Sequence, residues 1–206
     1  MVYIIMICIA APLLLLMPML ERQSRLLLGF VLSGMITAVC AYEINSVICA
    51  RFHLSGTELS VTAAPIVEET LKALPVLFYA MLMNDDKKLI LPLAMATGIG
   101  FAILENAFLF ITYADQADIL WAMIRGVSTS LSHGICTLIV GCGIIFVHKQ
   151  KKLFCTGTFA LLAAAMTLHA IFNLLIQSPY DYAALALPII IYSVYWIVRL
   201  RPQTPK

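Results

Sequence analysis

Long apolar stretches alternate with short polar connections along the whole chain. An α-helix needs about 20 apolar residues to cross the hydrocarbon core of a bilayer, and a window of that length finds seven segments. They run 2–20, 26–50, 59–83, 89–113, 119–147, 153–177 and 183–200. No segment shows the short alternating pattern of a membrane β-barrel. We therefore expect an all-α, polytopic bundle of about seven transmembrane helices.

Composition agrees with the hydrophobic pattern. Hydrophobic residues make up 62% of the 206-residue chain, and charged residues only 12%. A soluble domain carries about 25% charged residues, so a soluble globular enzyme and a disordered tail are both excluded. The net charge of +2 does not indicate a nucleic-acid partner, because most cationic residues lie in short connections. We expect residues 1–206 to form a single domain embedded in the lipid bilayer.

Lysine and arginine gather on one side of the predicted bundle. The first, third and fifth connections and the C-terminal tail contain Arg22, Arg25, Lys87, Lys88, Lys149, Lys151, Lys152, Arg199, Arg201 and Lys206. The opposite side contains only Arg51, together with Asp115, Asp118 and Asp181. Cytoplasmic connections are enriched in such cations. The distribution therefore predicts an N-terminus outside the cell membrane and a C-terminus in the cytoplasm.

Several titratable residues fall inside the apolar segments, where charged groups are costly and usually functional. They are Glu43, Glu68, Glu69, Lys72, Glu105, Arg125, His133 and His169. Glu68 and Lys72 lie one helical turn apart and can pair, and Arg125 can reach the interface with its long side chain. Four carboxylates against two cations still leave an acidic excess beside two histidines. Such a set suits a divalent transition metal.

The helical rise of about 1.5 Å per residue brings most of these groups to one depth. Glu68, Glu105 and His169 come out roughly 12–14 Å below the outer ends of helices that run in opposite directions. His133 is the exception, at roughly 21 Å. Neighbours on a helix project about 100° apart, so one of Glu68 and Glu69 can face a reacting centre while the other contacts Lys72 or a neighbouring helix.

Side chains four residues apart share a helix face and can support a ligand. Such pairs are Phe101 with Glu105, His133 with Thr137, and His169 with Asn173. Glu43 has three interpretations: a supporting or substrate-binding carboxylate, a partner of Arg125, or a hydrogen-bond partner of a neighbouring helix.

Four short motifs lie on successive segments. Residues 68–72 read EETLK, and residues 100–106 read GFAILEN. They resemble two motifs of the PrsW family of intramembrane proteases, EExxK and FxxxE within a GFAxxEN setting. Arg125 followed by His133 and Thr137 resembles the third motif, and residues 169–173, HAIFN, resemble HAxxN. The matched stretch runs from about 65 to 173. Phe172 departs from the Trp expected there more often.

The PrsW family is related to the CAAX prenyl proteases and bacteriocin-processing proteins. That group has a similar Glu-Glu motif but carries His where this chain has Glu105, so Glu105 favours the PrsW branch. The resemblance implies hydrolysis of a peptide bond in a membrane-anchored protein of the bacterial cytoplasmic membrane. Its typical substrate is an anti-sigma factor, cut first near the outer membrane face.

For the site itself, we expect Glu105, His133 and His169 to hold a Zn²⁺-type ion with an open position for water. Glu68 or Glu69 would take the proton from that water, and Asn173 would orient His169 or donate to the developing oxyanion. The residues expected to support this site are Lys72, Asn106, Arg125, Thr137 and Glu43.

Two alternatives remain at this stage. A glutamic-type protease would activate water with a paired acid and carboxylate and would need no metal. A proton- or cation-coupled transporter would use the same Glu/His cluster as a relay. Transporters usually show internal repeats and helices broken at mid-membrane, and this chain shows no convincing repeat.

Overall fold

The structure is a computed structural model that describes residues 1–82, 87–149 and 154–200. These residues form helices and no strand. The helices are α1 (Val2–Leu16), α2 (Arg22–Phe52), α3 (Gly56–Val61), α4 (Ala63–Leu82), α5 (Lys87–Thr112), α6 (Ile119–Met123), α7 (Ser130–Lys149), α8 (Phe154–Ile176) and α9 (Asp181–Leu200). A π-helical stretch, Ile124–Thr129, joins α6 to α7, and short 3₁₀ turns lie at Met17–Met19 and Ala114–Gln116.

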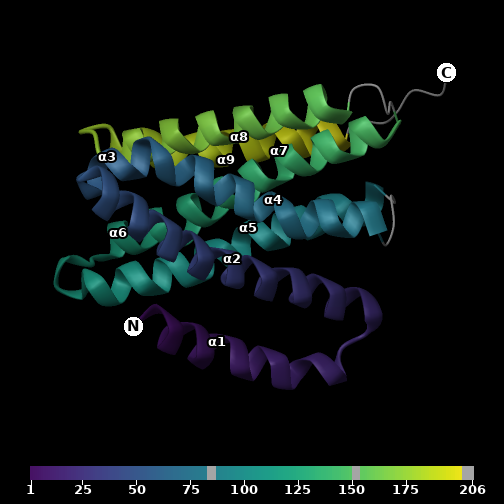
Figure 1. The fold of residues 1–206 in the computed structure, drawn as a ribbon, viewed down its shortest axis with the longest axis horizontal. Helices are drawn as coiled ribbons and strands as arrows, with labels where there is room; N and C mark the ends of the chain where they lie inside the picture. The colour runs from purple at the N-terminus through teal and green to yellow at the C-terminus, as the bar shows by residue number, and fades with distance from the viewer. Residues whose placement is uncertain (83–86, 150–153, 201–206) are drawn as a thin grey trace.

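In Figure 1 the long helices run back and forth between the two sides of the view, so that their connections fall alternately at the two ends. This confirms the predicted all-α, polytopic fold. By length and composition, five described segments can cross a membrane: Val2–Met19, Arg22–Phe52, Lys88–Thr112, Ile119–Ile145 and Thr156–Ile176. The apolar stretch of α9, Tyr182–Val198, is shorter, and α4 carries three charged residues. The spans 59–83 and 183–200 therefore stay predictions.

The third apolar segment is not one continuous helix as expected. The short helix α3 ends at Val61, and α4 begins at Ala63. In a continuous helix the ring of Pro65 would clash with the carbonyl of Val61, and its missing N–H would leave that carbonyl without a partner. The break separates α3 from α4 at the end of the bundle that also contains the α5–α6 and α8–α9 connections (Figure 1).

A capping box starts α3. The Ser55 hydroxyl accepts a hydrogen bond from the backbone N–H of Glu58, and the Glu58 carboxylate accepts one from the backbone N–H of Ser55 at 2.8 Å. These two bonds satisfy N–H groups that a helix start otherwise leaves unpaired. Hydrogen bonds from the backbone and side chain of Ser55 lower the pKa of Glu58 below its ordinary value, so the cap persists in mildly acidic solution.

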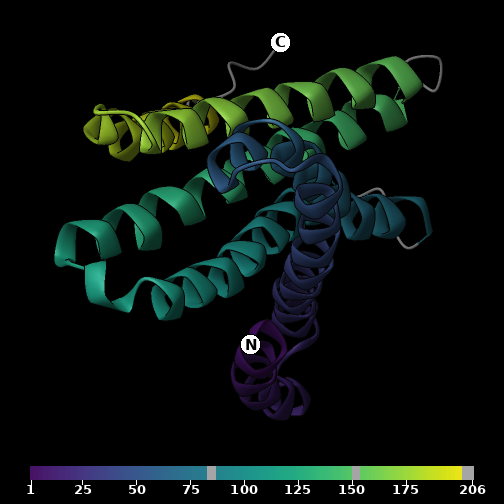
Figure 2. The same cartoon turned by 60° about the vertical axis from the view of Figure 1, so that its left-hand side comes forward.

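Glycines let α5 approach both of its main neighbours closely. A Cβ atom added at Gly34 of α2 would overlap the backbone carbonyl of Thr97, and one at Gly98 would overlap the backbone of His133 on α7. Ala94 and Ala102 share this small-residue face of α5 and are fully buried. Backbone-to-backbone packing of this kind is typical of membrane helices. In Figure 2, α1 and α2 run across the direction of α7 and α8, and α8 lies at the opposite side of the molecule from α1.

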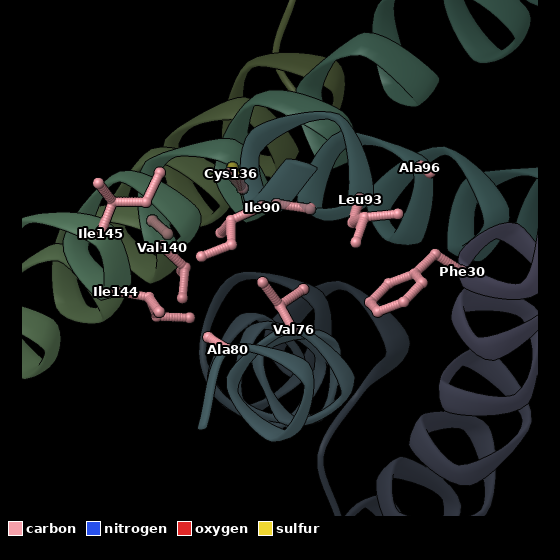
Figure 3. Close-up of a cluster of buried hydrophobic side chains, with 12 residues drawn as sticks. Phe30, Val76, Ala80, Ile90, Leu93, Ala96, Cys136, Val140, Ile144 and Ile145 are labelled. Atoms are coloured by element: carbon pink, nitrogen blue, oxygen red, sulfur yellow. The ribbon is translucent and has the colours of Figure 1, made fainter. Parts of the chain in front are cut away.

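Apolar side chains of α4, α5 and α7 pack together in one core (Figure 3). Val76 of α4, Ile90 and Leu93 of α5, and Val140 and Ile144 of α7 are all buried there. These residues lie at the ends of their helices that are joined to the α4–α5 and α7–α8 connections. The polar residues of the candidate site lie in the other half of the same helices.

The cationic residues that predict orientation begin or end helices at the same end of the bundle as this core. Arg22 begins α2, Lys87 begins α5 and Lys149 ends α7, and these three ends lie together in Figure 1. Lys151, Lys152, Arg201 and Lys206 lie outside the described residues. The orientation in the membrane stays a prediction.

We expect Gly34→Ala to lower the free energy of unfolding by about 1–3 kcal/mol, because the added methyl group overpacks the contact between α2 and α5. Gly29→Ala on the same helix is the matched control. A Cβ atom there meets only the flexible end of Met17, at 3.6 Å, so better helix propensity should make it neutral or stabilising by up to about 1 kcal/mol. Unfolding in detergent measures both variants, and equal stability of the two would contradict the close packing.

Candidate active site

Three helices bring a carboxylate and two imidazoles together in the half of the bundle away from the apolar core. Glu68 lies on α4, His133 on α7 and His169 on α8. Each offers a potential ligand atom, and these atoms lie within 4.8 Å of one another. All three residues are at least nine-tenths buried. The rings of the two histidines pack edge to face, with centroids 4.8 Å apart.

Glu69 holds His169 from the side opposite Glu68. Its Oε1 atom accepts a hydrogen bond from Nδ1 of His169 at 2.7 Å, so the ring proton lies on Nδ1 because a carboxylate only accepts. The other ring nitrogen, Nε2, faces Glu68, and its distance to Glu68 Oε2 is 3.7 Å. A carboxylate that orients an imidazole in this way is typical of metal-binding and catalytic histidines.

Lys72 neutralises Glu69 in a fully buried position. Its Nζ atom donates to Glu69 Oε1 at 2.6 Å and to His133 Nδ1 at 2.9 Å, and it lies 4.7 Å from the centre of the Phe101 ring. An ammonium group has donors and no acceptor, so Nδ1 of His133 accepts. The sequence allowed this lysine to pair with either Glu68 or Glu69; the structure places it with Glu69.

Glu105 contacts the other nitrogen of His133. Its Oε2 atom lies 2.7 Å from His133 Nε2, and its side chain is 29% exposed. Glu105 therefore lies beside His133 and outside the group of three that the geometry brings together. The expected ligand set, Glu105, His133 and His169, differs from that group by one residue, with Glu68 in the place of Glu105.

His133 reaches this cluster although its estimated depth set it apart. The π-helical stretch Ile124–Thr129 precedes it on the chain. A π-turn takes more residues than an α-turn, so the chain advances less along the axis than a uniform α-helical rise implies. The estimate assumed a continuous α-helix from Ile119, so the π-helical stretch accounts for part of the difference.

Two buried carboxylate oxygens lack a hydrogen-bond partner within the described part of the chain, Glu68 Oε2 and Glu69 Oε2. Burying an unpaired carboxylate oxygen is costly. The Oε2 atom of Glu68 faces the free lone pair of His169 Nε2 at 3.7 Å, beyond hydrogen-bonding distance. Two acceptors that face each other at this separation favour a cation between them, so this donor set fits a divalent metal.

The remaining predicted residues take structural contacts. Asn106 donates to the backbone carbonyl of Arg125 at 2.7 Å and thereby ties α5 to the π-helical stretch. The hydroxyl of Thr137 donates to the backbone carbonyl of His133 at 3.0 Å, and not to its ring. Asn173 donates to the backbone carbonyl of Ser60 at 2.8 Å and joins α8 to α3.

Glu43 lies apart from the cluster. Its Oε1 atom accepts a hydrogen bond from the Tyr3 hydroxyl at 2.6 Å, in an exposed position. Of its three interpretations, the structure shows the bond to a neighbouring helix, α1. Arg125 is half-buried in the π-helical stretch and forms no ion pair with any carboxylate among the described residues.

A cavity of about 520 Å³ leads to the cluster between α2, α3, α4 and α5. Glu68 and Glu105 lie in its wall, and most other lining residues are apolar. Asn45 of α2 also lines it and donates to Glu68 Oε1 at 3.4 Å. Sequence reasoning missed Asn45. The available signal was an amide within an otherwise apolar segment, but its partner lies on another helix.

Comparison with known proteins identifies one family. The chain matches the family described as PrsW family intramembrane metalloprotease over residues 22–199, which is most of its length. The resemblance carried by the four motifs is thereby confirmed. No curated protein and no solved structure matches the chain.

We expect Lys72→Met to lower the free energy of unfolding by about 3–5 kcal/mol, because it leaves the buried Glu69 carboxylate without its cation. The double variant Lys72→Met/Glu69→Gln removes the charge as well and should recover part of that loss. Arg51→Gln changes an exposed cation and serves as the control. Unfolding in detergent measures all three, and a Lys72→Met variant as stable as Arg51→Gln would contradict the ion pair.

Proposed function

The chain belongs to the PrsW family of intramembrane metalloproteases, and we propose that it hydrolyses its substrate at the buried cluster around Glu68. Membership makes the chain a peptide hydrolase and a multi-pass membrane protein, and it implies a membrane protein as substrate. It favours the protease over the coupled transporter. The description as a metalloprotease favours a metal-dependent reaction over the glutamic-type alternative.

We assign the metal to Glu68, His133 and His169 and propose Zn²⁺ as the ion. Because Lys72 donates to Nδ1 of His133, this ring would bind the ion through Nε2, after that nitrogen gives up the proton it holds toward Glu105. The supporting observation is the pair of facing acceptors, Glu68 Oε2 and His169 Nε2, 3.7 Å apart in a buried site. Two imidazoles and one carboxylate, with a position open for water, form a ligand set typical of catalytic zinc. This assignment exchanges the roles that we expected for Glu68 and Glu105.

When bound, the ion would polarise the substrate carbonyl and lower the pKa of water. Glu105 is then the proposed general base, because it is the more exposed carboxylate and lines the cavity next to His133. It would take a proton from the attacking water and return it to the leaving amine. Glu69 keeps His169 in the tautomer with Nε2 free, and Lys72 keeps Glu69 charged. Asn173 holds α3 at the mouth of the site through Ser60.

The proposed substrate is a membrane-anchored protein cut near the outer membrane face, as expected for an anti-sigma factor. Two observations support this position. The cluster lies in the half of the bundle away from the cationic helix ends, and the cavity beside it lies between α2, α3, α4 and α5 in that same half. Its mostly apolar wall suits a segment that leaves the hydrocarbon core.

Metal content tests the assignment directly, by mass spectrometry of protein purified without chelators. We expect about one zinc per wild-type chain, lost in His133→Ala, His169→Ala and Glu68→Gln and retained in Glu105→Gln. Glu43→Gln, outside the cluster, is the control and should retain the metal. Retention in Glu68→Gln together with loss in Glu105→Gln would restore Glu105 to the ligand set. Wild-type protein that stays active without any metal would contradict the metal site.

Activity tests the base. The substrates are synthetic peptides, each with one apolar segment of helix length between polar flanks (the single-span peptides). Each carries a fluorophore and a quencher on either side of the third of the apolar segment that lies nearest the outer membrane face (the outer third). With a peptide that the wild type cleaves, Glu105→Gln should lower kcat by about 10²–10⁴-fold, the range that general base catalysis contributes. Asn106→Ala, which changes the neighbouring residue, should retain far more activity. Equal losses in the two variants would argue against a base at Glu105.

A further inference from the structure

One face of α2 forms a wall of the 520 Å³ cavity. Ala38, Ala41, Asn45 and Cys49 line it and recur every three or four residues, which places them on one side of the helix. Asn45 is the member of this stripe that contacts the cluster, through its bond to Glu68. This helix precedes all four family motifs, so the proposed chemistry gives Asn45 no role.

The amide of Asn45 is only half satisfied. Its Nδ2 atom donates to Glu68 Oε1 at 3.4 Å, whereas its Oδ1 atom is buried and has no hydrogen-bond partner in the part of the chain that the structure describes. Buried side-chain oxygens nearly always have a partner. Asn45 itself lines the cavity, so a rotation of its amide brings this oxygen to the cavity, where a donor on a ligand can satisfy it.

The chemistry of the cavity restricts that donor. Most of the wall is apolar, so a charged donor would lose its hydration with little compensation. A peptide N–H is a neutral donor. An extended peptide within a membrane has N–H groups that neither water nor its own helix satisfies. Both groups, the Asn45 oxygen and the N–H of an unwound substrate, therefore gain by pairing.

We propose that Asn45 binds the main chain of an extended substrate segment, its Oδ1 atom accepting a peptide N–H beside Glu68. The apolar walls on either side, which include Ala41 and Leu104, take an uncharged, apolar side chain of the same segment. The proposal rests on the proposed function for the place of Glu68 at the reacting centre. It adds a substrate-binding residue on α2, and it gives the substrate a chemical class: an unwound stretch of apolar residues.

Replacement of single amides in the peptide tests this bond. An ester at one position removes one N–H and changes little else, so the single-span peptides are made with an ester at each successive position of the outer third. Their dissociation constants are measured by fluorescence anisotropy with the full-length protein in lipid nanodiscs. We expect one ester position to weaken binding to the wild type by about 5–10-fold, the loss of one hydrogen bond.

Variants of Asn45 combined with the ester peptides form a double-mutant cycle, which measures the coupling between this side chain and each peptide N–H. In Asn45→Ala and in the nearly isosteric Asn45→Leu, that same ester should weaken binding no further, because the acceptor is already gone. Asn45→Asp keeps an acceptor oxygen and should keep the ester effect. Ser33→Ala changes another polar residue of α2, one that does not line this cavity, and should behave as the wild type. A purely structural asparagine would lower stability without coupling to any ester position.

The binding measurement separates this inference from the proposed hydrolysis. Coupling between Asn45 and one ester position, with no peptide cleaved, would support the inference and contradict the proposed function. Cleavage of a peptide without such coupling would support the proposed function and overturn the inference. Failure of every single-span peptide to bind would also overturn it.

Discussion

Burial of the Glu69 carboxylate is the constraint on which the rest of the site depends. A buried charge is tolerated only when it is paired and hydrogen-bonded, and Glu69 meets that condition through Lys72 and His169. Each partner also contacts a further residue of the site. Lys72 donates a hydrogen bond to His133, and the second ring nitrogen of His169 faces Glu68. One carboxylate thereby sets the ring orientations of two histidines on two different helices.

The network needs a rigid frame, and the packing of α5 supplies it. Glycines on α2 and α5 bring helix backbones into contact, a geometry that leaves little freedom to slide or rotate. The apolar core (Figure 3) packs the same helices, α4, α5 and α7, against one another at their other ends. Each of these helices therefore contributes residues to the apolar core with one half and to the polar site with the other. Van der Waals packing in one half fixes the positions from which charged groups in the other half project.

The sequence predicted the all-helical bundle correctly, because the thickness of the bilayer restricts the length of a spanning helix to a narrow range. It also brought the right helices together at one depth, since rise per residue is nearly constant in an α-helix. Two departures have local causes: Pro65 lies just after the break in the third segment, and the π-helical stretch shortens the path along the axis to His133. Two questions that the sequence left open are which of Glu68 and Glu69 pairs with Lys72, and which carboxylate lies with the two histidines. Both depend on how the helices rotate and cross, which a single sequence does not encode locally. Asn45 was missed for the same reason.

Adjacent glutamates allow one helix to serve two environments. Residues 68 and 69 project about 100° apart, so a single turn of α4 presents one carboxylate to the cavity and the other to the closed network behind it. Glu69 is completely shielded, whereas Glu68 lines the cavity. The shielded group can stay charged and immobile while the open one exchanges partners. If the two positions were separated by a full turn, both carboxylates would face the same way, and the orienting charge would compete with the reacting groups for the same ligand. Under the proposed function, the adjacent pair supplies one carboxylate that orients the site and one that faces the cavity.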